Sequence, residues 1–275
     1  MEKSFEIRFP FESDYENLKA LWQLAFDDTK ESLDFFFENT VSPQRVLAVF
    51  EKGKPVSALY MLESDILISG KTYSAYYIYA VTTHPDYRGK GLMKSLFEEL
   101  FKVAKDRKID YLFLVPEEEY LFKIYERTGF KNGFFYSEKT IYKKDFETTK
   151  SIKTEKITYE KYRNAIKQNS DNTPVAILKE STFRSFFSSV SGEVNIAFVE
   201  NEGYALYEET EKAVVIFELF GNEELLLEAV FQNTEKEEII YRQISSEKPI
   251  PYGMIYRIND VPEIENGFFG IPYSN

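Results

Sequence analysis

Hydrophobic and polar positions follow two different periods along the first eighty residues. Alternating or short continuous apolar runs, typical of strands, occur at residues 5–9, 45–50, 56–62, 65–68 and 73–81. Helical spacing replaces this pattern at residues 12–26 and again at residues 32–39. The pattern therefore predicts one strand, two helices and then a meander of antiparallel strands.

The pattern changes after Thr83, where a polar loop leads into a long amphipathic segment. Apolar residues recur at four-residue spacing at Leu92, Leu96, Leu100 and Ala104, which predicts a helix with one apolar face. An apolar strand at 111–115 follows, then a helix that Gly129 ends, and then a strand at 134–142. A strand–helix–strand unit of this kind predicts two parallel strands.

The pattern starts again after a polar linker at residues 143–154. The predicted elements are helices at 159–168, 181–189 and 222–231 and strands at 194–199, 204–208, 213–220 and 238–243. The hairpin at 198–207 repeats the residue pattern of the hairpin at 49–60, although two hairpins can also resemble each other by chance. We therefore expect a mixed α+β protein with two tandem domains, 1–146 and 155–275, each a mostly antiparallel sheet with flanking helices.

Composition excludes several kinds of chemistry. The chain has no cysteine and one histidine, His84, so disulfides, thiolate nucleophiles, thiolate metal sites and histidine clusters are absent, and we expect no metal. The net charge of −12 makes the chain a poor electrostatic match to nucleic acid. Most of the excess acid lies in residues 151–275, where it either forms a solvated surface or attracts cationic substrates.

No segment has the length or composition of a membrane span or signal peptide. The first residues contain acids where a signal peptide needs an apolar run, and the longest apolar runs are strand-sized. Without cysteines that would use an oxidising compartment, the sequence predicts a cytoplasmic protein that does not bind membranes.

The residues that carry chemistry lie between the predicted strand at 73–81 and the following helix. Gly89 and Gly91 allow sharp backbone turns, the helix start offers free N–H groups, and Arg88 and Lys90 add positive charge, a combination suited to phosphate. It is neither of the common nucleotide motifs. Lys94 stands where a dinucleotide fingerprint needs glycine, and Asp65 stands where a Walker loop ending in Gly-Lys-Thr at 70–72 needs one.

The run Arg88-Gly89-Lys90-Gly91-Leu92-Met93 resembles the signature of the GNAT superfamily of N-acyltransferases, with Met93 replacing the usual small residue. Ala-Val before the loop and Met93 resemble the enhanced-intracellular-survival (Eis) branch, whose members have two tandem GNAT-like domains. They often also carry a sterol-carrier-like domain, for which we expect no room here.

The resemblance implies a binding site for acetyl-CoA as co-substrate. The amides of Arg88, Gly89, Lys90, Gly91, Leu92 and Met93 would hold the pyrophosphate. The strand edge at Val81, Thr82 and Thr83 would pair with the pantetheine arm.

Catalytic roles are also implied by the resemblance. Tyr125, four residues before Gly129, matches the family tyrosine near the CoA sulfur, and a phenol can protonate the leaving thiolate. The predicted strand at 73–81 lacks the carboxylate that many relatives use as a base. In the Eis branch the terminal carboxylate is implicated, so Asn275 is a candidate base if the aromatic tail docks. His84 is a weaker candidate, since its position matches a variable loop. If neither serves, a water relay to surface acids is the expected route for the proton.

The amine acceptor is expected near the two early helices. Trp22, Asp27, Asp28 and the phenylalanines at 35–37 offer aromatic walls and acids, which suit an organic amine, although most of these phenylalanines are expected in the core. The second domain has no basic glycine loop and is expected to be a degenerate repeat that frames this site. Formation of a homo-oligomer through it is an alternative.

These observations predict an N-acetyltransferase that moves an acetyl group from acetyl-CoA to a small-molecule or peptide amine by direct attack in a ternary complex. A CoA-binding sensor or scaffold without turnover is the main alternative. An adaptor that binds nucleic acid or peptide through Arg88 and Lys90 is disfavoured by the net charge.

Overall fold

The computed structural model describes residues 5–146, 151–188, 194–244 and 249–270. The first half contains β1 (Phe5–Arg8), α1 (Tyr15–Trp22), α2 (Lys30–Asn39), β2 (Val46–Glu51), β3 (Lys54–Ile68), β4 (Lys71–Thr83), α3 (Leu92–Asp106), β5 (Tyr111–Leu114), α4 (Glu119–Glu126) and β6 (Lys131–Tyr142). The second half contains α5 (Tyr159–Asn169), β7 (Val175–Leu178), α6 (Glu180–Ser188), β8 (Asn195–Val199), β9 (Gly203–Glu209), β10 (Val214–Gly221), α7 (Glu223–Gln232), β11 (Glu238–Gln243) and β12 (Ile250–Arg257).

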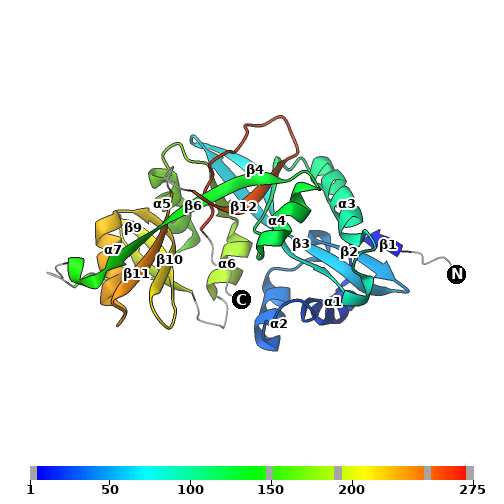
Figure 1. The fold of residues 1–275 in the computed structure, drawn as a ribbon, viewed down its shortest axis with the longest axis horizontal. Helices are drawn as coiled ribbons and strands as arrows, with labels where there is room; N and C mark the ends of the chain where they lie inside the picture. Colours follow the sequence, from blue (N-terminus) through cyan, green and yellow to red (C-terminus); the bar gives the residue numbers. More distant parts are fainter. Residues whose placement is uncertain (1–4, 147–150, 189–193, 245–248, 271–275) are drawn as a thin grey trace.

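One mixed sheet runs through both halves. Its strand order is β1-β2-β3-β4-β5-β12-β6-β11-β10-β9-β8, and β7 pairs with β3 outside this path. Figure 1 shows two lobes that share the long strand β6, with α6 lying between them. The expected mixed α+β class is confirmed.

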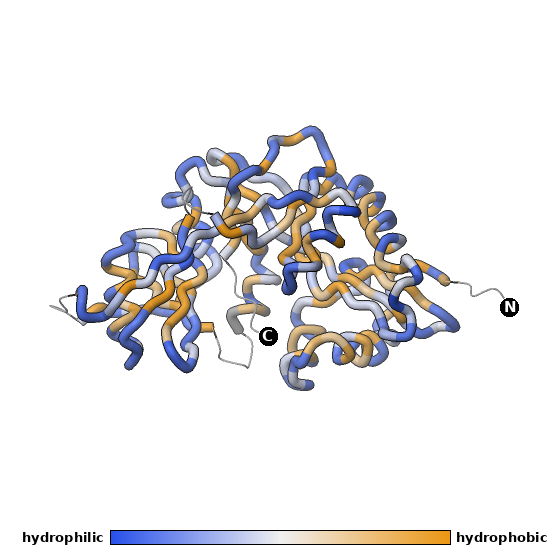
Figure 2. The backbone as a smooth tube through the Cα atoms, in the orientation of Figure 1, coloured by the Kyte–Doolittle hydropathy of each residue, from blue (hydrophilic) through white to orange (hydrophobic). Residues whose placement is uncertain are grey.

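The near-continuous apolar run of β2 arises because both faces of this strand are covered. Val46 and Ala48 face the core formed with α1 and α2, whereas Leu47 and Val49 face the core beneath α3. Successive side chains of a strand point to opposite faces, so helices on both sides bury all of them. Figure 2 shows that apolar segments follow the strands of both lobes. Among the described residues, no helix is long and apolar enough to cross a membrane.

Both halves contain the same local order. An antiparallel hairpin, β2–β3 or β8–β9, is followed by a strand, a helix and a parallel strand, β4-α3-β5 or β10-α7-β11.

The sequence pattern missed two strands, β7 and β12. β12 belongs by sequence to the second half but lies between β5 and β6 of the first, antiparallel to both. The division at residues 146 and 155 stays a prediction, and any such division must account for this inserted strand.

A short segment near residue 268 closes a ring of strands. Gly267 donates to Gly133 O at 2.7 Å and accepts from Phe135 N at 2.9 Å, so it lies along β6. Phe268 donates to Pro174 O at 2.8 Å and accepts from Ala176 N at 3.0 Å, so the segment also lies along β7. Because β7 pairs with β3, hydrogen bonding continues around β3, β4, β5, β12, β6, the segment and β7.

Candidate active site

Two parallel strands separate next to the glycine loop. β4 and β5 pair only over Ala75–Tyr77 and Tyr111–Phe113, after which β4 continues to Thr83 while β5 ends at Leu114. Within the described part of the chain, no strand pairs with the edge of β4 that follows Tyr77 and faces β5. This edge therefore offers backbone groups to an extended ligand.

A bulge redirects the last residues of β4. Ala80 has a φ of 47°, and the register with β3 shifts between Ala58 and Tyr60. A bulge bends the strand and re-aims the residues after it. The side chain of Thr82 is buried and its Oγ1 has no hydrogen-bond partner among the described residues. Thr82 can therefore contribute to the predicted site only through its backbone groups.

The glycine loop joins β4 to α3 as the sequence predicts. Gly89 and Gly91 have φ values of 73° and 77°, and a Cβ built on either would meet no atom within 4 Å. Gly91 is the N-cap of α3 and supplies no side chain to its free N–H groups. The side chain of Leu92 is buried in the core under α3, and the half-buried side chain of Met93 packs against that core.

The basic side chains of the loop are exposed but held in place. Arg88 Nε donates to Thr83 O at 3.3 Å, and Lys90 donates to Asp86 O while its Nζ lies 4.4 Å from the Tyr87 ring centre. His84 accepts a hydrogen bond from the amide of Asp86 at 3.2 Å, which is a local structural contact. The loop thus presents two cations beside a helix N-terminus, an arrangement suited to phosphate groups.

Tyr125 lies on α4 with its side chain largely buried. Its ring packs 5.7 Å from Phe97 and 6.4 Å from Phe130 between ring centres. Burial, with smaller contributions from Tyr120 and Glu117, raises the pKa of the Tyr125 phenol far above its ordinary value. The phenol therefore stays protonated at physiological pH and can donate a proton or hydrogen bond.

Glu117 is a carboxylate that the sequence interpretation did not single out. It follows β5 and precedes Glu118, the N-cap of α4, so it lies at the carboxyl end of a strand rather than in the helix. Its charge contributes to the raised pKa values of both Tyr125 and Tyr79, where burial is the main cause. The available signal was its position, because ligands of open α/β sheets bind at the carboxyl ends of strands.

An aromatic cluster with one acid lies near Tyr79 on the other side of β4. Trp22 Nε1 donates to Asp28 Oδ2 at 2.7 Å, and the Trp22 ring lies 5.6 Å from that of Tyr79. Phe36 lies 5.3 Å from Trp22, and Phe186 of α6 lies 5.8 Å from Tyr79. Asp28 also raises the pKa of Tyr79, after burial, so its charge lies close to that hydroxyl.

The remaining predicted acceptor residues divide between core and surface. Phe37 is buried in the core of α1 and α2, Phe35 is half-buried, and Asp27 is exposed. Asn275 lies outside the described residues, although the tail is seen up to Gly270. Among the described residues, no three carboxylate or histidine side chains gather into a metal-binding group.

Comparison with known proteins identifies the class. Residues 6–133 match the acetyltransferase (GNAT) domain family. This match covers just under half of the chain, and it agrees with the GNAT acyltransferase class that the loop motif predicts for the N-terminal half. No curated protein has a significantly similar sequence.

Solved structures share the fold over nearly the whole chain. A protein of Enterococcus faecalis V583 superposes with a TM-score of 0.74 at 15% identity, covering 93% of this chain and 73% of its own. The GCN5-related N-acetyltransferase of Kribbella flavida gives 0.71 at 12%, covering 92% and 71%. Eis1 of Mycobacterium abscessus gives 0.66 at 12%, covering 93% and 74%. At this identity the likeness establishes the fold, including its similarity to an Eis protein.

Proposed function

We propose that the protein is an N-acetyltransferase that uses acetyl-CoA as donor and an organic amine as acceptor, in one ternary complex. One observation carries this proposal. The unpaired edge of β4 leads directly into the glycine loop, while Tyr125, Glu117 and Asp28 belong to segments beside the same strands. A cofactor arm and an amine can thus meet where β4 and β5 separate.

The donor would bind through backbone groups. The amides at Gly89, Gly91 and the start of α3 would hold the pyrophosphate, helped by Arg88 and Lys90. The amide-bearing pantetheine arm would pair with the edge of β4 in the manner of an added strand. In this binding mode the positive φ angles of Gly89 and Gly91 would matter more than particular side chains.

The acceptor would approach from the aromatic cluster. Tyr79 and Phe186 present half-buried aromatic rings, and Asp28 supplies a negative charge whose position the N–H of the buried Trp22 indole fixes. Aromatic faces and a carboxylate both attract an organic ammonium ion. Because Phe186 comes from α6, the second half would contribute one wall of the acceptor site.

The chemistry would be a direct substitution at the thioester carbonyl carbon. The neutral amine nitrogen forms the new C–N bond, the tetrahedral intermediate collapses, and the C–S bond breaks to release CoA thiolate. Glu117 would accept the proton that the nitrogen loses, and the Tyr125 hydroxyl would stabilise the thiolate by donating its proton or a hydrogen bond. Holding both substrates in one complex replaces a collision between them with a fixed orientation.

The direct test is release of free CoA thiol from acetyl-CoA across a panel of amines. We expect turnover with at least one amine and a 10²–10⁴-fold lower kcat in Tyr125→Phe with CoA affinity retained. Tyr241→Phe, an equally buried tyrosine of β11, is the matched control and should keep full turnover. CoA binding without turnover on any amine would instead support the sensor alternative.

A further inference from the structure

A glutamate of the second half is completely buried. Glu218 on β10 is 0% exposed, accepts a hydrogen bond from the Tyr204 hydroxyl, and accepts another from the amide of Gly270. Its Oε2 has no hydrogen-bond partner among the described residues. A buried carboxyl with one unsatisfied oxygen is costly and calls for a functional explanation.

A bulge aims Glu218 into this position. The β9–β10 register shifts at Phe217, because Ile216 pairs with Tyr207 whereas Glu218 pairs with Leu206. Before the bulge, Ile216 faces the core under α7, whereas Leu206, opposite Glu218, belongs to the core that contains the closing segment. The extra residue changes which face the even-numbered positions occupy, so the carboxyl is turned inwards.

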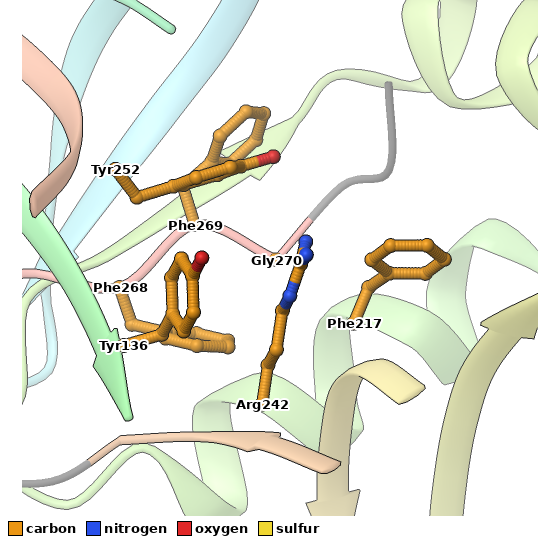
Figure 3. A pocket seen from close by; sticks show the side chains of 7 residues that line it. All are labelled: Tyr136, Phe217, Arg242, Tyr252, Phe268, Phe269 and Gly270. Atoms are coloured by element: carbon orange, nitrogen blue, oxygen red, sulfur yellow. The ribbon is translucent and has the colours of Figure 1, made fainter. Parts of the chain in front are cut away.

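Gly270 can lie this close to Glu218 only because it has no side chain. A Cβ at Gly270 would lie 2.4 Å from Phe217 O and 2.8 Å from Glu218 Cβ. Figure 3 shows Gly270 and Phe269 beside Tyr252, Arg242 and Phe217, around a small cavity. Glu218 therefore holds the end of the segment Gly267–Gly270 that closes the ring of strands.

The closing segment contacts the point where the catalytic strands separate. Phe269 lies 5.4 Å from Tyr77 and 5.1 Å from Phe113, between ring centres. Tyr77 and Phe113 are the last paired residues of β4 and β5, and their own rings stack at 5.0 Å. The segment thus packs against the point where β4 and β5 separate.

The groups that face Glu218 provide no compensating charge. They are the hydroxyl-bearing rings of Tyr204 on β9, Tyr162 on α5 and Tyr252 on β12. Arg242 on β11 lines the small cavity beside Gly270, and its Nε donates to Glu138 at 3.3 Å. No salt bridge within the described ranges reaches Glu218. Burial raises the pKa of its carboxyl to about 7, although Tyr204 and Gly270 oppose the shift.

We propose that Glu218 is a positioning residue whose carboxyl anchors the segment Gly267–Gly270 in a proton-dependent way, so that the packing of this segment behind the point where β4 and β5 separate depends on pH. When the segment leaves, water reaches the carboxyl and it regains an ordinary affinity for protons. The seated state binds the proton more tightly, so protonation favours seating. The free energy that holds the segment Gly267–Gly270 in place therefore decreases as the pH rises towards 7. Above pH 7 it does not decrease further. An effect on catalysis rests on the proposed acetyl transfer.

Hydrogen exchange of the folded full chain tests the anchor without using activity. Between pH 5.5 and 8.5, with correction for intrinsic rates, we expect protection at Gly267–Gly270 and Val175–Leu178 to fall at least tenfold in the wild type. In Glu218→Gln this pH dependence should disappear, whereas the exposed Glu209→Gln should behave like wild type. Val46–Glu51 is an internal control whose protection should not follow this transition. A pH dependence that survives Glu218→Gln overturns the proposal.

A second variant keeps the test decisive if Glu218→Gln fails to fold. Tyr204→Phe removes a donor to the ionised carboxylate, so the midpoint of the exchange transition should move to higher pH. An unchanged midpoint would overturn the assignment. If acetyl transfer is also observed, its kcat/KM should follow the same transition in the wild type and lose it in Glu218→Gln. Failure to find any acceptor would leave the exchange result unaffected, so the two proposals fail separately.

Discussion

The indole of Trp22 donates a hydrogen bond to Asp28 at 2.7 Å. Trp22 is itself buried between the early helices and β3 and β4, so its N–H is a rigid donor. The contact fixes an exposed carboxylate beside an aromatic wall and near the Tyr79 hydroxyl. A surface acid thereby becomes a positioned group of the candidate acceptor site.

Replacement of Asp28 with asparagine should weaken acceptor binding selectively. The amide oxygen can still accept from Trp22, so the fold is retained while the charge is lost. We expect KM for a cationic amine to rise roughly tenfold, with the Kd of CoA unchanged. Asp27→Asn, which removes the same charge from the exposed neighbouring residue, is the control for charge alone. An equal rise of KM in the two variants would show that Asp28 acts only through the overall electrostatic field of the protein.

Gly91→Ala should weaken CoA binding without a matching loss of stability. Gly91 and Gly70 have φ values of 77° and 78°, and a Cβ on either meets open space. Alanine at either position should therefore cost about 1 kcal/mol of backbone strain. Only Gly91 lies in the loop, where the added methyl would stand between the amides and the pyrophosphate. Calorimetry should give at least a tenfold higher Kd for Gly91→Ala and an unchanged Kd for Gly70→Ala.

Glu117→Gln should impair the chemical step. Loss of a general base lowers kcat by roughly 10²–10⁴-fold, and CoA affinity should remain because the loop is untouched. Glu119→Gln, in the first turn of α4, controls for the loss of a nearby acid. Single-turnover acetyl transfer measures the step directly. An unaltered rate in Glu117→Gln would exclude this residue as the base.

The free energy of unfolding should depend on pH because of Glu218. Between pH 4.5 and 7 the folded protein holds a proton that the unfolded chain has released, since burial raises the folded pKa from 4.5 to about 7. The free energy of unfolding therefore falls as the pH rises through this window, by about 3 kcal/mol, and is level above it. Urea unfolding at pH 5 and pH 8 should show this loss in wild type and Glu209→Gln. If the free energy of unfolding of Glu218→Gln fell by the same amount between pH 5 and pH 8, Glu218 would not be its cause.

Some of the site could be predicted from residue types and spacing. Gly89, Gly91, Arg88 and Lys90 lie on the loop between β4 and α3, and Tyr125 lies on α4, where the motif indicated. Glu117 was missed because three consecutive glutamates before a helix have an ordinary explanation in the helix dipole. Its approach to Tyr125 and Tyr79 depends on how α4 packs into the core that it shares with β4.

The sequence by itself determined most of the local elements and the glycine loop between β4 and α3, because helical periodicity, glycine and a helix start are properties of neighbouring residues. Only the tertiary structure decided where β12 and Gly267–Gly270 pair, since β12 joins β5 and β6 and the closing segment joins β6 and β7. Such pairing depends on which sheet edges remain open after the other strands have packed. The burial of Glu218 also depends on tertiary contacts, because it requires a bulge in β10 and the distant Gly270. In the sequence alone, Glu218 cannot be distinguished from the other acids of the second half.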